Sequence, residues 1–252
     1  MSYRTNRTIV AAFSVLLSTI PPLVAEENCA PEGYEALFDG NTLDNWDVHP
    51  ESVGHWKVLE GVIDCDAMSQ APDNEKHLWT KESFEDFQLQ VEWRIKETNG
   101  LYPVPTILAD GTHKRDKNGT EVTTPTPNAD SGILLRGEVK SQCNIWCWPV
   151  GSGEVYGYRM DVNMPAEVRA AVTPVLNADN PVGEWNKFII TMIGDRLTVS
   201  LNGKTVIDNA QLPGIPARGP IGLQHHGGKG EDGKYNNASS LVQFRNIFIE
   251  EF

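Results

Sequence analysis

Two charged side chains in one predicted strand could form part of a reactive surface. Residues 87–95 alternate apolar and polar side chains, a pattern typical of a strand with one buried face. Glu92 and Arg94 lie two positions apart, so they project from the same polar face. A carboxylate can exchange a proton with a substrate, and a guanidinium can stabilise developing negative charge. The alternative is a solvated sheet face that carries an ordinary surface ion pair.

A histidine near the C-terminus is the second candidate for proton transfer. In the predicted strand 221–226, Gln224 and His226 share one face, whereas His225 lies on the apolar face. We therefore expect His226 to face a site. An imidazole with the ordinary pKa of about 6.5 can act as a base or an acid at neutral pH. The alternative is a structural hydrogen bond near the Gly227–Gly228 turn.

Short strands must position these residues. Further strand patterns occupy residues 36–38, 56–59, 62–65, 77–80, 132–136, 156–161, 187–193, 197–201, 204–207 and 242–250. Asn202–Gly203 between two of them predicts a two-residue hairpin turn. Helix is scarce, with residues 166–172 as the best candidate, so the crossovers that parallel strands need are missing. The sequence predicts an all-β antiparallel sandwich or jelly roll.

Two long segments do not fit the strand pattern. Residues 96–130 are rich in Pro, Thr, Gly and Asn, and residues 140–157 contain Trp146, Trp148 and several glycines. Loops of this length in a compact domain usually build a site or move. Both segments start where predicted strands end, so we expect them to wall a groove.

The net charge of the chain limits the classes of partner that it can bind. The 252 residues carry 34 acidic and 21 basic side chains, for a net charge of -13. Such a charge repels nucleic-acid phosphates and anionic membranes, and the sequence shows no basic patch that would overcome the repulsion. We expect neither a nucleic-acid partner nor membrane association after export.

The first 25 residues predict a secretory signal peptide. Arg4 and Arg7 precede an apolar run over residues 9–20, and the segment ends in small residues at Ala25. Residues 26–252 then form one predicted domain, exported to the periplasm or the extracellular space. In that oxidising setting Cys29, Cys65, Cys143 and Cys147 permit two disulfides, whose pairing the sequence leaves open.

Eight motifs follow one another along nearly the whole mature chain. They are LFDGNTLDNW (37–46), WKVLEGVI (56–63), LWTKESFEDFQLQVEWRI (78–95), DSGILLRG (130–137), VYGYRMD (155–161), GEWN (183–186), LNGK (201–204) and GPIGLQHHG with VQFRNIFI (219–249). In this order they resemble the 3-keto-disaccharide hydrolase domain family. The resemblance implies a concanavalin A-like lectin/glucanase sandwich with a carbohydrate-binding face, acting on glycosides whose C3 hydroxyl is oxidised to a ketone. The chain departs from the pattern at Asp130 and Asp161, where relatives often carry an amide.

A 3-keto-glycoside would require a base, an oxyanion stabiliser and an acid. The ketone acidifies the C2 proton, a base removes it, and the aglycone leaves from C1 before water adds. Glu92, Arg94 and His226 form the candidate catalytic polar face, on which His226 could serve as base or acid. Arg136 is a candidate cation for the enolate. Direct hydrolysis by two carboxylates is the alternative, but the E-x-D-x-E signature of sandwich glucanases is absent.

Other residues are candidates for binding the substrate. Trp146 and Trp148 could stack on sugar rings, or else cover a sheet edge. Arg159 could also hold an enolate, and Asp161, two residues on, could bind substrate or only neutralise that arginine. These candidates and Gln224 complete the predicted substrate-binding set.

One carboxylate is a candidate metal ligand. Asp130, at the start of a strand, could help to bind a divalent cation such as calcium. No other cofactor is indicated.

Two other functions remain open from the sequence. One is a non-catalytic carbohydrate-binding module with the same fold, and the other is an exported structural domain whose polar face contacts another protein. Scattered positions for Glu92, Arg136 and His226 would favour the structural domain.

Overall fold

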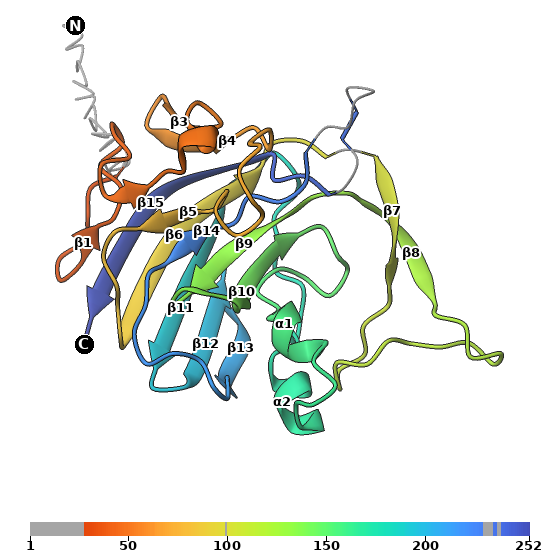
Figure 1. Ribbon diagram of the computed structural model, residues 1–252. Coiled ribbons are helices and arrows are strands. Elements are labelled where there is room, and N and C mark those ends of the chain that lie inside the picture. Colours follow the sequence, from red (N-terminus) through yellow and green to blue (C-terminus); the bar gives the residue numbers. More distant parts are fainter. Residues whose placement is uncertain (1–27, 99, 229–233, 236–237) are drawn as a thin grey trace, which may run out of the picture.

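The computed structural model describes residues 28–98, 100–228, 234–235 and 238–252. Two antiparallel β-sheets lie face to face, and a two-stranded arm projects to one side (Figure 1). The predicted signal peptide lies outside the described residues. No helix in the described ranges is long and apolar enough to cross a membrane.

The larger sheet has eight strands. Its order is β13 (Lys204–Gln211), β12 (Arg196–Leu201), β11 (Asn186–Ile193), β6 (Phe87–Ile95), β15 (Val242–Glu251), β4 (Val62–Cys65) and β3 (Trp56–Leu59), with β1 (Glu35–Ala36) beside β15. The β12–β13 turn has positive φ at Asn202 and Gly203, as the predicted two-residue hairpin requires.

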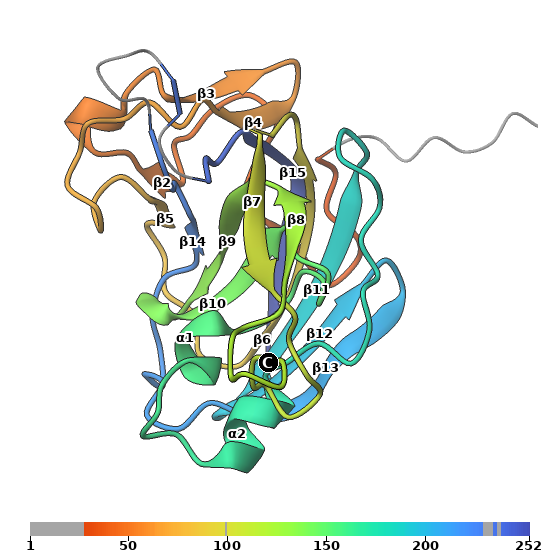
Figure 2. The ribbon, with the colours of Figure 1, turned by 90° about the vertical axis from the view of Figure 1, so that its right-hand side faces the viewer.

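The smaller sheet has five strands and faces the larger one (Figure 2). Its order is β10 (Glu138–Trp146), β9 (Asp130–Leu135), β14 (Gly222–Leu223), β5 (Leu78–Thr80) and β2 (Trp46–Asp47). Every strand pair in both sheets is antiparallel, which confirms the predicted all-β sandwich.

The core fills the space between the two sheets. In β6 the alternate residues Leu89, Val91 and Trp93 are buried, and Cys143 and Ile145 of β10 belong to the same apolar cluster. Full burial of one such side chain stabilises the fold by roughly 1.5–3 kcal/mol. The polar residues that alternate with these therefore point outward, on opposite sides of the molecule for β6 and β10.

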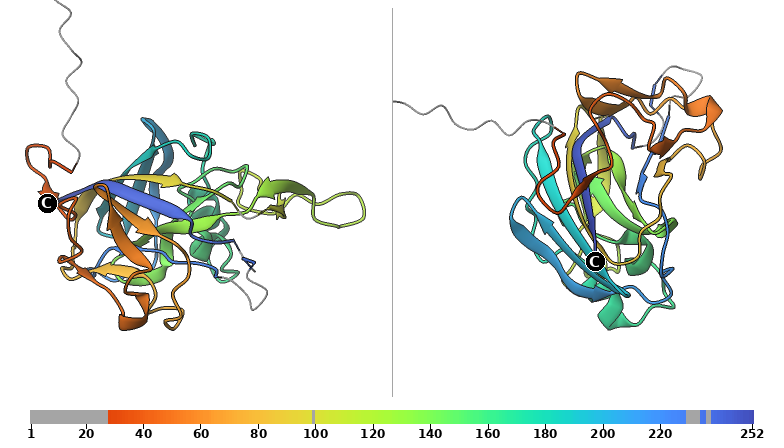
Figure 3. Two further views of the ribbon diagram at one scale, coloured as in Figure 1. Left: turned by 90° about the horizontal axis from the view of Figure 1, so that it is seen from above. Right: turned by 90° about the vertical axis from the view of Figure 1, so that its left-hand side faces the viewer.

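The two segments that did not fit the strand pattern contain strands that were not predicted from the sequence. Residues 96–130 contain the arm, which is a ribbon of β7 (Leu101–Pro105) and β8 (Thr123–Pro127) that extends away from the sandwich (Figure 3). Residues 140–157 contain most of β10 instead of a long loop. A bulge between Glu138 and Gln142 interrupts the alternation there.

Helices occupy little of the chain. The 3₁₀ turn η1 (Pro50–Ser52) precedes β3, and α2 (Ala166–Ala171) lies where a helix was predicted. The prediction of a strand over 156–161 was wrong, because α1 (Tyr156–Arg159) lies there. At Gly157 an added Cβ would lie 2.4 Å from the carbonyl oxygen of Lys140, so only glycine permits this approach of α1 to β10.

All four cysteines lie in the described part of the chain and are free thiols. Cys65 and Cys143 are buried, and burial raises the pKa of the Cys65 thiol to about 12. The two disulfides that the sequence permits are therefore not formed.

Candidate functional site

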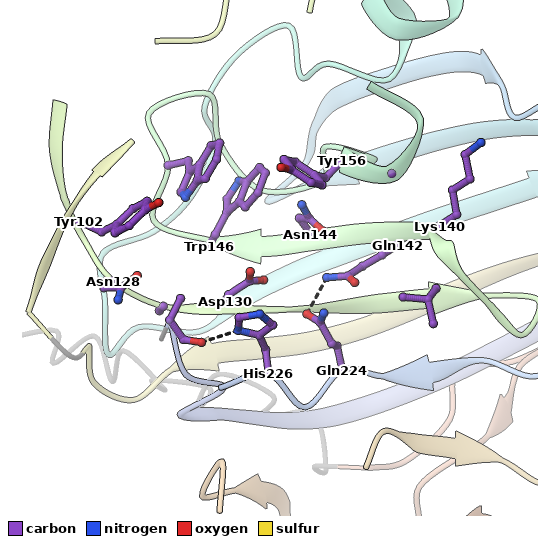
Figure 4. Close-up of a pocket in the computed structure, with 15 residues that line it drawn as sticks. Tyr102, Asn128, Asp130, Lys140, Gln142, Asn144, Trp146, Tyr156, Gln224 and His226 are labelled. Atoms are coloured by element: carbon purple, nitrogen blue, oxygen red, sulfur yellow. Dashed lines mark hydrogen bonds between the residues drawn. The ribbon is translucent and has the colours of Figure 1, made fainter. Parts of the chain in front are cut away.

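A cavity of ≈ 580 Å³ opens on the outward face of the five-stranded sheet. Strands β9 and β10 form its floor, the segment after β14 forms one side, and the foot of the arm and α1 close it (Figure 4). Its lining comprises Tyr102, Asn128, Ala129, Asp130, Val139, Lys140, Gln142, Asn144, Trp146, Trp148, Tyr156, Gly157, Gln224, His226 and Ala238.

Strand register brings the floor residues side by side. In the β9–β10 ladder, Trp146 pairs with Asp130 and Asn144 pairs with Gly132. Because side chains alternate along a strand, Gln142, Asn144 and Trp146 share the outward face while the residues between them enter the core. One register therefore places a carboxylate, two amides and an indole on one floor.

Two glutamines on the floor hold each other in a fixed orientation. Gln142 Nε2 donates to Gln224 Oε1 at 2.7 Å and to the Ser131 carbonyl at 3.0 Å (Figure 4). Both Nε2 hydrogens of Gln142 are thus used, which leaves Gln142 Oε1 as an acceptor and Gln224 Nε2 as a donor for a ligand. Gly132 permits this pair, because a Cβ there would lie 2.4 Å from Gln142 Nε2.

Asp130 is a half-buried residue beside a histidine, and its Oδ1 is buried. Burial raises its pKa from 3.8 to about 6, and the nearby His226 acts in the opposite direction. Its Oδ1 has no hydrogen-bond partner among the residues that the structure describes. A carboxyl group with such a pKa retains its proton at a pH where an exposed aspartate has lost it.

Backbone contacts fix the ring of His226. Its Nδ1 bonds to the Ala238 carbonyl oxygen, and its backbone N–H donates to Ser240 Oγ at 2.7 Å. A carbonyl oxygen can only accept, so Nδ1 carries the hydrogen and the lone pair of the neutral ring is on Nε2. Ser240 Oγ in turn donates to the Asp130 carbonyl at 2.7 Å, which ties the histidine segment to β9.

Aromatic rings form one wall of the cavity. Trp146 and Trp148 stack with ring centroids 4.2 Å apart and planes within 4°. Tyr156 meets both rings nearly perpendicularly, at 6.1 Å and 6.3 Å. Trp146 Nε1 donates to the Gly151 carbonyl at 2.8 Å, which fixes the stack against the sheet. The cavity therefore joins a polar floor to a flat apolar wall, a combination suited to a ring that carries hydroxyl groups.

The family follows from a match along most of the chain. A family model described as 3-keto-alpha-glucoside-1,2-lyase-like domain matches residues 33–250. The chain belongs to this family. Membership confirms the resemblance found in the motifs and places this lyase-like domain among carbohydrate-active proteins. No curated protein matches the sequence significantly.

Solved structures show the same fold. Two crystal structures of candidate glycosyl hydrolases from Parabacteroides distasonis ATCC 8503 resemble this lyase-like domain. One has a TM-score of 0.54 and 17% identity over 90% of this chain and 100% of that chain. The other has a TM-score of 0.50 and 21% identity over 87% of this chain and 99% of that chain. At such identities the likeness establishes the fold alone.

Four of the predicted catalytic and substrate-binding residues of the lyase-like domain lie in the cavity. They are Trp146, Trp148, Gln224 and His226. Asp130 joins them as a floor residue. Within the described residues, no group of three or more histidine, cysteine, aspartate or glutamate side chains could hold a metal ion, so the cation site at Asp130 stays a prediction.

Glu92 and Arg94 do not reach this cavity, which corrects the expected convergence. Both point outward from the eight-stranded sheet, across the core from β9 and β10. Glu92 accepts from Arg245 Nε at 2.8 Å. Arg94 Nε donates to Gln243 Oε1 at 2.7 Å, and its guanidinium lies 4.7 Å from the Trp185 ring centroid. The prediction failed because alternation shows which residues share a face but not which sheet carries that face.

Arg136 lies outside the cavity, and its side chain is hydrogen-bonded within the fold. It has φ 51° in the turn after β9, and its side chain is buried. Its guanidinium donates to the carbonyls of Glu85, Gly194 and Pro216 and bonds to Asp86. The arginine thus ties three segments together at the end of the sandwich and has no free edge for an enolate.

Arg159 and Asp161 lie behind the wall and do not line the cavity. Arg159 Nε pairs with Glu154, and both side chains are fully buried. Asp161 accepts from Lys140 Nζ at 2.6 Å instead of neutralising Arg159. The sequence missed Glu154 as the true partner because the pairing depends on α1, which had been predicted as a strand.

Several lining residues were missed in the sequence. Gln142 and Asn144 lie in a segment predicted as a loop, although Gln142, Asn144 and Trp146 alternate with apolar Cys143 and Ile145. That alternation was the available signal. Tyr102 and Asn128 come from the arm, which carries no comparable signal.

Proposed function

We propose that this lyase-like domain cleaves 3-keto-glycosides by C2 proton abstraction, elimination of the aglycone and addition of water. The observation that carries the proposal is the placement of the His226 imidazole and the Asp130 carboxyl, whose Oδ1 is buried, in one cavity over a floor of amides. It replaces the predicted group of Glu92, Arg94, Arg136 and His226, whose members lie on different surfaces. Glu92, Arg136 and His226 are scattered, which is the arrangement expected of a structural domain. The cavity with His226 and Asp130 is the observation that favours an enzyme over that alternative.

His226 acts as the base in the proposed reaction. The lone pair on Nε2 takes the C2 proton, and the C2–H electron pair forms an enolate whose charge rests on the C3 oxygen. Gln224 Nε2 is the available donor for that oxygen, because its amide oxygen is already used by Gln142. The enolate then re-forms the C3 carbonyl as the C1–O bond breaks, which leaves a C1–C2 double bond.

Asp130 acts as the acid in the same reaction. The leaving glycosidic oxygen takes its carboxyl proton as the C1–O bond breaks, so the aglycone departs as a neutral alcohol. A pKa of about 6 suits this role, because the proton is present at mildly acidic pH and still transfers readily. Asp130 then takes a proton from water as the hydroxyl adds to C1, and His226, after exchange with solvent, protonates C2, which yields the free 3-keto-sugar and restores both groups.

Turnover of a defined substrate tests the proposal. The purified mature chain is incubated with 3-keto-trehalose, and release of 3-keto-glucose is followed. We expect turnover by the unmodified protein and a loss of at least a hundredfold in Asp130→Asn and in His226→Gln. Glu92→Gln is the matched control, because that carboxylate lies on the opposite sheet and should leave the rate unchanged.

The test also separates the enzyme from a binding module. Saturable binding of the sugar with no product, abolished by Trp148→Ala, would identify a non-catalytic carbohydrate-binding domain. Turnover that persists in an Asp130→Asn, His226→Gln double variant would refute the assigned roles.

A further inference from the structure

The cavity has two chemically different halves along the strand direction. One half carries Gln142, Asn144 and Gln224, which offer hydrogen-bond donors and acceptors. The other half carries the Trp146–Trp148 stack, and Tyr102 also lines it. A glycoside has the same division, since the reacting sugar needs hydrogen bonds to its hydroxyl groups and the leaving group need not.

Asp130 marks the boundary between these halves. The strand register places it directly opposite Trp146, whereas Asn144 lies two residue pairs further along the ladder and Gln142 lies four pairs further. Under the proposed function, Asp130 protonates the glycosidic oxygen. That oxygen must lie next to Asp130, so the reacting ring extends over the amides and the leaving group extends toward Trp146.

Tyr102 is available at the aromatic end. It comes from β7 of the arm, pairs with Thr126 of β8, and keeps 51% of its surface exposed although it lines the cavity. In the described part of the chain it makes neither a side-chain hydrogen bond nor a ring contact, so the fold gives its ring no partner. Figure 4 shows it on the far side of Trp146 from Tyr156.

We propose that Tyr102 and the Trp146–Trp148 stack form a subsite for the leaving group, and that this leaving group carries a six-membered ring. The subsite rests on the proposed function and adds a specificity determinant to it. Trp146 is buried within the stack, so Trp148 and the half-exposed Tyr102 ring present the apolar surfaces to a sugar or aryl ring. A methyl group would contact neither surface fully. The arm thereby selects the leaving group without contacting the reacting ring.

Substrates that differ only in the leaving group test the subsite. The ratio of kcat/KM between Tyr102→Ala and the unmodified protein is measured for the methyl, phenyl and glucosyl 3-keto-glucosides, the last being 3-keto-trehalose. We expect a fall of roughly threefold to tenfold for phenyl and glucosyl leaving groups and a change below about twofold for methyl. Because each ratio compares the same substrate, the intrinsic reactivity of the leaving group cancels.

Two variants control for damage to the arm. Tyr102→Phe keeps the ring and should keep the selectivity. Leu101→Ala changes the neighbouring residue, which is 70% exposed and does not line the cavity, and should have no effect. A selective loss for phenyl alone or glucosyl alone would support the subsite and identify its preferred ring.

Other outcomes would overturn the subsite. Equal loss on all three substrates, or no loss on any, would contradict it while leaving the proposed cleavage intact. If no substrate is cleaved at all, the proposed function fails, and titration of phenyl glucoside into the Tyr102→Ala and unmodified proteins decides the subsite separately. Unchanged affinity would then overturn it, and a weakened affinity restored by Tyr102→Phe would support it.

Discussion

The proton on Asp130 determines how the proposed reaction responds to pH. Burial disfavours the charged carboxylate, and this moves the pKa up from 3.8 to about 6. Only the protonated form can give a proton to the leaving oxygen. The fraction of active protein should therefore fall as the pH rises through that pKa, by tenfold per pH unit well above it.

A pH profile of kcat between pH 5 and pH 9 measures this effect. We expect a descending limb above about pH 6 in the unmodified protein. In Asp130→Asn the residual rate should be lower and should lack that limb. A descending limb of the same position in the variant would assign the titration to another group.

At the scale of elements, a buried ion pair joins the arm to the wall of the cavity. Arg159 in α1 pairs with Glu154, and its Nη1 contacts the Gly111 carbonyl at 3.2 Å and His113 Nε2 at 3.1 Å. Its Cζ lies 5.3 Å from the Tyr156 ring centroid, so the same guanidinium supports the aromatic wall. Burial raises the pKa of Glu154 to about 7 against the opposing effect of Arg159. The arm and the wall therefore depend on one cation.

Removal of that cation should weaken the fold more than removal of the whole pair. Arg159→Met leaves the Glu154 carboxyl buried without its partner, and we expect a loss of about 3 kcal/mol in unfolding free energy at pH 8. Adding Glu154→Gln removes the stranded charge and should restore part of that loss. Urea unfolding of both single variants and the double variant gives the coupling energy. Additive losses would show that the two groups do not depend on each other.

Local sequence pattern was sufficient to predict some of the strands and turns. The alternation in residues 87–95 predicted β6 with its correct bounds, and Asn202–Gly203 predicted the β12–β13 turn. The pattern failed in β10, because Gln142 and Asn144 face a cavity and a bulge breaks the period. It failed again in α1, because Tyr156 and Tyr158 around a glycine imitate a strand.

At the scale of the whole molecule, the sequence could not show which of the two sheets carries the site on its outward face. Alternation placed Glu92 with Arg94 and His226 with Gln224, and both pairs do share a face. The relative position of the two pairs depends on strand order, since β6 lies in the eight-stranded sheet and the His226 segment follows β14 of the other. That order arises from contacts between distant parts of the chain, which a single sequence does not display.

The dependence of the site on contacts between distant parts of the chain also explains which site residues could be predicted from the sequence. His226, Gln224 and the tryptophans were found because their own residue types suggested a ligand. Asp130 was assigned only to a cation, because the burial that raises its pKa comes from the whole fold. Tyr102 could not be found, because the arm brings it to the cavity although 124 positions of sequence separate it from His226.

The fate of the C2 hydrogen tests the central claim most directly. A 3-keto-trehalose deuterated at C2 is cleaved in ordinary water, and the released 3-keto-glucose is analysed by mass before spontaneous exchange becomes significant. Elimination through His226 predicts that the product loses its deuterium and that cleavage slows severalfold relative to the unlabelled substrate. Full retention of deuterium at C2 with an unchanged rate would mean that C1 is displaced directly, which would contradict the account.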